Sequence, residues 1–183
     1  MIIDSISYAK RHKLNVRFTV EDASRTNFDV LLKIAKLIEK AGADRFSFAD
    51  TVGILHPAAT SDIFSRLSSE IKIPIHGHFH NDFGLATANA LQALQFGASC
   101  VDVTINGLGE RCGISSLAEV VTSLDELFKV KNSWNFKILN DISSYVEEIS
   151  KITDNDTRPI TGKNAYTHNA GLHVSSVIKD GSL

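Results

Sequence analysis

The chain has 183 residues, of which 43% are hydrophobic, and a formal net charge of -2. This is enough to bury the core of one globular domain, with or without an appendage. The weak charge, without a basic stripe, argues against binding to nucleic acid or to an anionic membrane surface.

The cysteine content and the apolar runs of the sequence bear on where the protein is located. Cys100 and Cys112 are the only cysteines, too few for a disulfide scaffold and normal for a reducing compartment. No apolar run reaches the length of a membrane span, and the first residues lack a signal-peptide profile. We therefore expect a soluble cytoplasmic protein.

Short apolar segments rich in β-forming residues alternate with amphipathic helical stretches. The predicted strands span residues 15–19, 45–49, 73–78 and 100–105. The predicted helices span residues 28–41, 57–71, 85–96 and 116–128. This alternation indicates a parallel α/β architecture with right-handed crossovers. No GxGxxG lies in a strand-to-helix turn, which argues against a dinucleotide-binding domain.

Polar residues gather at or just after the predicted strand ends. They are Arg17, Thr19, Glu21, Asp50, Thr51, His78, His80, Asp82, Thr104 and Asn106. In (β/α)8 barrels the active site lies at this carboxyl-terminal rim. Four βα units are half of such a barrel and would leave two open strand edges. The pattern therefore leaves two options, part of a barrel or a smaller open sheet.

The pattern changes from about residue 129. A helix is predicted over 138–152, a polar loop containing Pro159 over 153–161, and a segment rich in small residues, with His168 and His173, over 162–183. We predict a partial barrel domain over 1–128 and a C-terminal extension over 129–183.

The third predicted strand runs into the sequence His-Gly-His-Phe-His-Asn-Asp, residues 76–82. Because side chains alternate along a strand, His78 and His80 share one face and can chelate one divalent metal ion. His76 lies on the same face, so His76 and His78 form a competing pair. Asn81 and Asp82 could accept hydrogen bonds from the rings. The alternative is that these histidines serve only packing and hydrogen bonding.

Three parts of the sequence together resemble the 2-isopropylmalate/homocitrate/citramalate synthase family. They are residues 16–25 with 49–53, residues 78–82 with 106–114, and residues 162–173. The resemblance covers nearly the whole chain. It implies the C-terminal half of a (β/α)8 TIM barrel, about four βα units (strands 5–8), followed by the start of a helical extension. Family members condense an acyl-CoA, usually acetyl-CoA, with a 2-oxo acid held on a divalent metal ion.

Within the family the chain is most similar to the homocitrate synthases, which act on 2-oxoglutarate in lysine biosynthesis through 2-aminoadipate. These enzymes place an arginine at the position of Arg17, where it meets the distal carboxylate of the substrate. A guanidinium suits a dicarboxylate and would stay unpaired against an apolar substrate. Ile114 supports this subtype, whereas Cys112 replaces a common asparagine. The alternatives are 2-isopropylmalate or citramalate synthase, and for Arg17 a salt bridge with Glu21 or Asp50.

The resemblance also assigns roles to the metal and substrate ligands. His78 and His80, and not His76, would hold the metal (Mg, Mn or Zn), which polarises the ketone. Thr19 and Thr51 would bind the substrate carboxylates, unless their hydroxyl groups only cap local backbone.

Two further residues would perform acid–base chemistry. Glu21 matches a glutamate at the barrel rim, and its alternative is a cap or salt bridge before the next helix. His173 matches a histidine of the extension that reaches a barrel mouth, often that of a partner subunit, so the full-length enzyme is expected to be a homodimer.

One expected element of the family lies in strands that this chain does not contain. It is an Arg-Glu or Arg-Asp motif whose carboxylate is the third metal ligand. Asp50 or Asp82 would be partial substitutes, while Glu110 and Arg111 are expected to form an ion pair that braces their loop. The competing interpretations are a catalytically inactive fragment and another metal-dependent β/α enzyme such as an aldolase or lyase.

Overall fold

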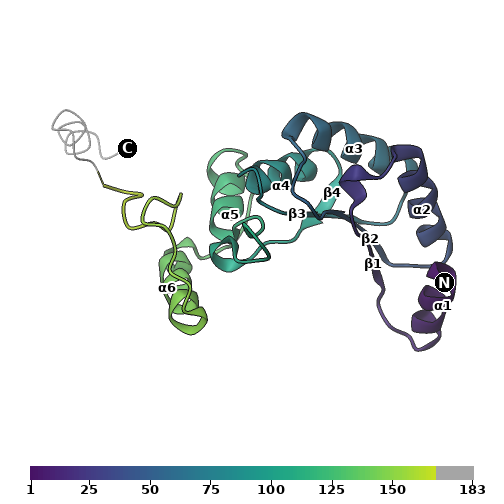
Figure 1. Ribbon diagram of the computed structural model, residues 1–183, viewed down its shortest axis with the longest axis horizontal. Helices are drawn as coiled ribbons and strands as arrows, with labels where there is room; N and C mark the ends of the chain where they lie inside the picture. Colours follow the sequence, from purple (N-terminus) through teal and green to yellow (C-terminus); the bar gives the residue numbers. More distant parts are fainter. Residues whose placement is uncertain (168–183) are drawn as a thin grey trace. The chain divides into compact units, whose positions relative to one another are not determined.

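The computed structural model describes residues 1–167 and contains one parallel sheet, with strand order β1-β2-β3-β4 (Figure 1). The strands are β1 (Arg17–Val20), β2 (Arg45–Asp50), β3 (Ile75–Phe79) and β4 (Ala98–Val101). Each strand pairs in parallel with the next along the chain. The predicted parallel α/β architecture is confirmed.

Helices connect and follow the strands. They are α1 (Ile2–Arg11), α2 (Phe28–Lys40), α3 (Pro57–Glu70), α4 (Ala86–Gln95), α5 (Leu117–Glu126) and α6 (Leu139–Ser150). The side chain of Asn27 caps α2 by accepting a 3.0 Å hydrogen bond from the Asp29 N–H. Pro57 opens α3, where a missing N–H costs nothing.

Helices α2, α3 and α4 pack against one face of the sheet, and the alternation of strand residues decides which side chains face them. Ile75 and Phe79 of β3 lie in the core, and the ring of Phe79 lies 5.8 Å from that of Phe64 in α3. Gly77 sits between them, since a Cβ there would come within 2.5 Å of the Phe79 ring. His76 and His78 therefore point to the opposite face of the sheet.

The strand boundaries differ from the prediction by up to four residues. Strand β3 begins after Pro74, which has no N–H to donate to the ladder. Strand β4 ends at Val101, four residues before the predicted end, and the last predicted strand residue, Ile105, begins a short 3-10 turn, Ile105–Gly107. Asn106 in that turn has a left-handed backbone (φ 57°), outside the region of regular strands.

Helix α1 was not predicted. Its residue Ile6 is 1% exposed and belongs to the core. Lys10, in its last turn, forms an ion pair with Asp44 at 2.7 Å. The apolar contacts of Ile2 and Ile6 and the ion pair of Lys10 therefore hold the helix against the domain.

The chain divides into two compact units, Met1–Ser133 and Trp134–Leu183, a few residues beyond the predicted boundary at 128/129. The first unit holds the sheet and helices α1 to α5. In the second, α6 is preceded by the 3-10 turn Phe136–Ile138. Within residues 1–167, no helix has both the length and the apolar content needed to cross a membrane.

Candidate active site

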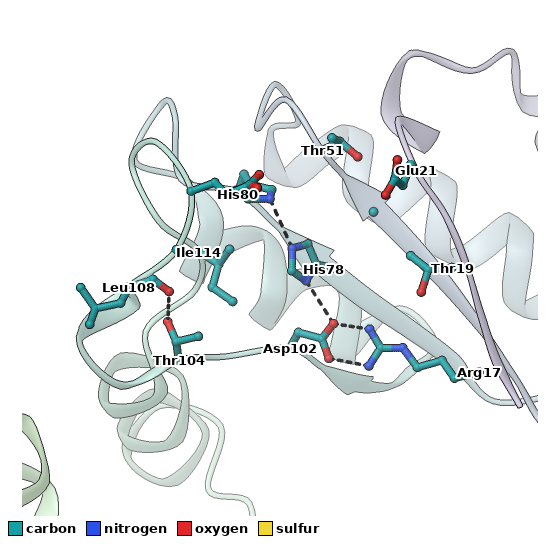
Figure 2. Close-up of a pocket in the computed structure, with 13 residues that line it drawn as sticks. Arg17, Thr19, Glu21, Thr51, His78, His80, Asp102, Thr104, Leu108 and Ile114 are labelled. Atoms are coloured by element: carbon teal, nitrogen blue, oxygen red, sulfur yellow. Dashed lines mark hydrogen bonds and ion pairs between the residues drawn. The ribbon is translucent and has the colours of Figure 1, made fainter. Parts of the chain in front are cut away.

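A cavity of about 580 Å³ lies where β1, β2 and β3, together with the segment after β4, present their polar side chains (Figure 2). Residues from all four βα units and from the loop after β4 line it. They are Arg17, Thr19, Glu21, Ala49, Thr51, His78, His80, Asp102, Thr104, Leu108, Gly109, Glu110 and Ile114. The residues expected to bind metal or substrate or to act as acid or base are among them, namely Arg17, Thr19, Glu21, Thr51, His78 and His80. His173 lies outside the described residues.

The two histidines named as metal ligands meet in this cavity. The Nε2 atoms of His78 and His80 are 3.3 Å apart, and their rings are inclined at 66° (Figure 2). His80 is 8% exposed, and burial is the main cause that lowers its pKa, followed by the charges of His78 and Arg111. The geometry therefore brings together His78 and His80 rather than His76 and His78.

His76 has the surroundings of a buried structural histidine. It does not line the cavity and is 4% exposed, and its buried Nδ1 has no hydrogen-bond partner among the described residues. Burial, followed by the charges of Arg17 and Arg45, lowers its pKa. The side chain therefore lies on the cavity face of β3 without entering the cavity.

Sequence reasoning missed Asp102, which joins the two halves of the site. Its Oδ1 accepts a 2.8 Å hydrogen bond from Nη1 of Arg17, and its Oδ2 accepts bonds from Nη2 of Arg17 and from Nδ1 of His78, the latter at 3.1 Å. Burial raises the pKa of Asp102, but the hydrogen bonds from His78 and Arg17 outweigh it and leave the pKa well below its usual range. The signal available in the sequence was an acidic residue beside the fourth strand end.

Arg17 occupies a different position from the one predicted. It is the first residue of β1, in register with Arg45 of β2, and not at the strand end. Its side chain nevertheless reaches the cavity. Its salt-bridge partner is Asp102, so the expected alternatives Glu21 and Asp50 are both wrong.

The two aspartates expected as substitute ligands are engaged elsewhere. The Asp50 carboxylate is fully buried and accepts hydrogen bonds from the N–H groups of Ile54 and Leu55, at 3.2 and 3.0 Å. Asp82 forms a two-pronged ion pair with Arg111, at 2.7 and 2.8 Å. Neither lines the cavity, and both stabilise loops at its rim.

Arg111 forms the expected ion pair with Glu110 and also binds two partners in other loops. Its distance to Glu110 is 3.8 Å, longer than its bonds to Asp82, and its Nη2 donates to the carbonyl of Thr51 at 2.6 Å. The residue therefore ties the loop after β4 to the loops that follow β2 and β3.

The remaining site residues differ in how they are held. The Thr51 hydroxyl accepts a 2.7 Å hydrogen bond from the Asp22 N–H, which is the backbone-capping role weighed for it. Within residues 1–167, the side chains of Thr19 and Glu21 form no hydrogen bond and line the cavity. Thr104 donates to the Leu108 carbonyl at 2.6 Å and shapes the loop.

The described residues match two positions of a metal site. Two nitrogen ligands about 2.0–2.1 Å from one ion lie roughly 3.3 Å apart at a tetrahedral angle, close to the separation of the His78 and His80 nitrogens. Asp102 accepts from the other ring nitrogen of His78, the usual partner of a metal-binding histidine. Among residues 1–167, no group of three or more His, Cys, Asp or Glu residues is placed to hold a metal ion.

We expect the folded conformation of the loop after β4 to require glycine at position 113. Its φ is +85°, and an added Cβ would lie 1.9 Å from the Gly107 carbonyl oxygen, while Gly84 has a φ of +72° with open space around it. Alanine at either position costs about 1–2 kcal/mol for the left-handed backbone. Gly113→Ala should cost about 1–3 kcal/mol more, because the clash strains packed atoms. Urea unfolding of both variants measures the difference, and equal losses would contradict it.

The lowered pKa values of His76 and His80 predict a pH dependence of stability. The unfolded state, with a histidine pKa of about 6.5, binds more protons than the folded state just below that pH. The free energy of unfolding should therefore fall as pH drops below about 6.5. Denaturant titrations at several pH values between about 7.5 and 5 test this in the parent and in the double variant His76→Gln/His80→Gln. The slope of the free energy of unfolding against pH should be smaller in the double variant. If the slope were unchanged in the double variant, ionisable groups other than His76 and His80 would be the cause of the pH dependence.

The HMGL-like family model matches residues 1–146. A homocitrate synthase of Saccharolobus islandicus (strain L.S.2.15 / Lassen #1) is 47% identical over 180 residues, which are 98% of this chain and 39% of that protein. A homocitrate synthase of Sulfurisphaera tokodaii is 45% identical over 183 residues, 100% of this chain and 40% of that protein. The chain thus spans about two fifths of the length of these curated relatives.

Solved structures agree on the fold. An HMG-CoA lyase from Bacillus subtilis superposes with a TM-score of 0.74 at 21% identity, covering 90% of this chain and 57% of the lyase. An Acinetobacter baumannii HMG-CoA lyase, in complex with coenzyme A and 3-methylmalate, gives a TM-score of 0.76 at 21% identity, covering 92% and 59%. These likenesses confirm the predicted partial TIM barrel. With four parallel strands, a histidine pair on their cavity face and a family match over most of its length, the chain belongs to the HMGL-like family.

Proposed function

We propose that this chain carries the metal-binding and 2-oxo acid-binding part of an acyltransferase of the homocitrate synthase type. The reaction joins acetyl-CoA and 2-oxoglutarate to give homocitrate and CoA. One observation supports this most: Arg17, which suits a distal carboxylate, and the pair His78 and His80, which suits a metal ion, line the same cavity. The homocitrate synthases that match over nearly the whole chain support the same substrate pair.

Arg17 supports recognition of a dicarboxylate. A guanidinium carries five N–H donors, and Asp102 engages one hydrogen on each Nη atom. The remaining donors, including Nε–H, are available to a second carboxylate. A substrate with an apolar end would leave them unpaired, which favours 2-oxoglutarate over 2-oxoisovalerate or pyruvate.

His78 and His80 would hold the divalent metal, through Nε2 of each ring. The ion would supply Lewis-acid polarisation of the ketone of the bound 2-oxo acid. Thr19 and Thr51 lie on the same cavity wall and would donate hydroxyl hydrogen bonds to the substrate carboxylates. The Thr51 hydroxyl can do so because the contact from the Asp22 N–H uses only its oxygen.

Glu21 would take part in the proton transfers. Its carboxylate lines the cavity and makes no hydrogen bond within residues 1–167, so it is available to a substrate. The chemistry removes a proton from the acetyl methyl group, forms a carbon–carbon bond from that methyl carbon to the ketone carbon, and protonates the resulting alkoxide. Water then cleaves the thioester and releases CoA. His173 is proposed as the second acid–base group, contributed within a homodimer.

Within the described residues, the proposed metal site is incomplete. The described residues offer two metal ligands, and the chain spans about two fifths of its curated relatives. A further carboxylate ligand has to come from outside the described residues. The two-ligand site is the observation that favours the competing possibility of a protein without catalytic activity of its own.

The decisive experiment follows CoA release from acetyl-CoA by the purified chain with Mg²⁺ or Mn²⁺. Separate reactions contain 2-oxoglutarate, 2-oxoisovalerate or pyruvate. We expect release with 2-oxoglutarate alone, and its loss in His78→Ala and His80→Ala. Release with 2-oxoisovalerate or pyruvate instead would assign the chain to the isopropylmalate or citramalate branch. No release, with metal binding and folding intact, would support the non-catalytic alternative.

Arg17 should determine the choice of 2-oxo acid. Arg17→Gln is expected to lower kcat/KM for 2-oxoglutarate by on the order of 30-fold or more, because truncating a charge-assisted pair costs at least about 2 kcal/mol. The matched control is Arg45→Gln, since Arg45 is the register partner of Arg17 in β2 but does not line the cavity. Equal effects of the two substitutions would contradict the assignment of Arg17.

A further inference from the structure

Four polar side chains of the cavity form one continuous series of contacts. It runs from Arg17 through Asp102 to His78 and on to His80 (Figure 2). Asp102 is the only member that touches both the arginine and a histidine. The main chain fixes its place, because the Asp102 N–H donates to the Gly77 carbonyl at 2.9 Å.

We propose that Asp102, held by Arg17, is a positioning residue that sets the tautomer of His78 and thereby turns the lone pair of His78 Nε2 toward His80. The consequence for metal binding rests on the proposed function. The tautomer itself follows from the hydrogen bonds among Arg17, Asp102 and His78.

The first step concerns the proton on His78. Both oxygens of the Asp102 carboxylate accept hydrogen bonds from the Arg17 guanidinium, and an ionised carboxylate can only accept hydrogen bonds. Its Oδ2 lies 3.1 Å from Nδ1 of His78, so Nδ1 must carry the proton in this contact. In the neutral ring, Nε2 is then the unprotonated nitrogen, the form that a metal ion requires.

The second step concerns how Asp102 is held. Both carboxylate oxygens accept from Arg17, one from each Nη atom, which fixes the plane of the carboxylate. With that plane fixed, Oδ2 stays directed at His78 rather than rotating away. Arg17 thus acts on the metal site through Asp102, in addition to the substrate contact proposed for it.

The test compares Asp102→Ala, which removes every acceptor, with Asp102→Asn, which keeps one neutral acceptor. The first readout needs no metal: ¹⁵N NMR of the full chain, with ring signals assigned through His78→Gln. We expect the parent ring to be protonated at Nδ1. Asp102→Ala should shift the ring toward protonation at Nε2, where the His80 ring is the neighbouring acceptor, and Asp102→Asn should give an intermediate result.

The second readout is Zn²⁺ affinity, measured by competition with a chelator. Loss of a carboxylate behind a metal-binding histidine typically weakens binding by about 10–100-fold, and we expect this for Asp102→Ala with a smaller loss for Asp102→Asn. The control is Asp44→Asn, since Asp44 also pairs with a cation, Lys10, but does not line the cavity. It should leave both readouts unchanged.

The outcomes separate the inference from the proposed function. An unchanged His78 tautomer in Asp102→Ala would overturn the inference, whatever the metal affinity. Should the alanine variant not fold, an unchanged tautomer and Zn²⁺ affinity in Asp102→Asn would overturn it. If the parent bound no Zn²⁺, the proposed metal site would fail, while the tautomer would still decide the role of Asp102.

Discussion

A single carboxylate, that of Asp102, links side chains that arise from three separate strands. Arg17 begins β1, His78 lies near the end of β3, and Asp102 follows β4. An unpaired cation or anion in this partly enclosed cavity would have an unfavourable desolvation free energy, because less polarisable surroundings replace part of its water. The pairing offsets this cost, and each partner also holds the next in one orientation. Removing the carboxylate would leave a cation and a histidine proton without acceptors.

The sheet makes this arrangement possible because its four strands are parallel and in sequence order. Neighbouring strands then present residues of one face side by side, and the cavity forms where those faces carry polar groups. The opposite face is closed by the aromatic residues Phe46, Phe48 and Phe79 and by the helices. Burying that face fixes the register, since a slip of one residue would place the histidines of β3 in the core.

The rim of the cavity depends on contacts between loops rather than on the sheet. His80 lies just past the end of β3, where it forms an isolated antiparallel bridge with Ile114. The neighbouring Asn81 N–H donates to the Gly113 carbonyl at 3.0 Å, and the Arg111 side chain binds both Asp82 and the Thr51 carbonyl. The second histidine of the pair therefore owes its place to the loop after β4.

Much of this architecture follows from local patterns. The alternation of short apolar runs with helical periodicities predicted the four parallel strands, and the two-residue period of β3 predicted that His78 and His80 share a face. These features survive in the structure because they depend on neighbours along the chain. Strand ends were less predictable, since β3 begins only after Pro74 and β4 ends at Val101, four residues before the predicted end.

The tertiary structure decided the partners of the charged groups. Arg17 and Asp102 are separated by 85 positions, and nothing near Arg17 distinguishes Asp102 from Glu21 or Asp50 as its partner. Likewise, only the folded loops show that Asp50 caps its own loop and Asp82 binds Arg111. The sequence by itself determined the parallel strands, their buried face and the candidate histidines. Which charges meet depends on distances through space, and these are set by packing between strands and loops remote in the chain.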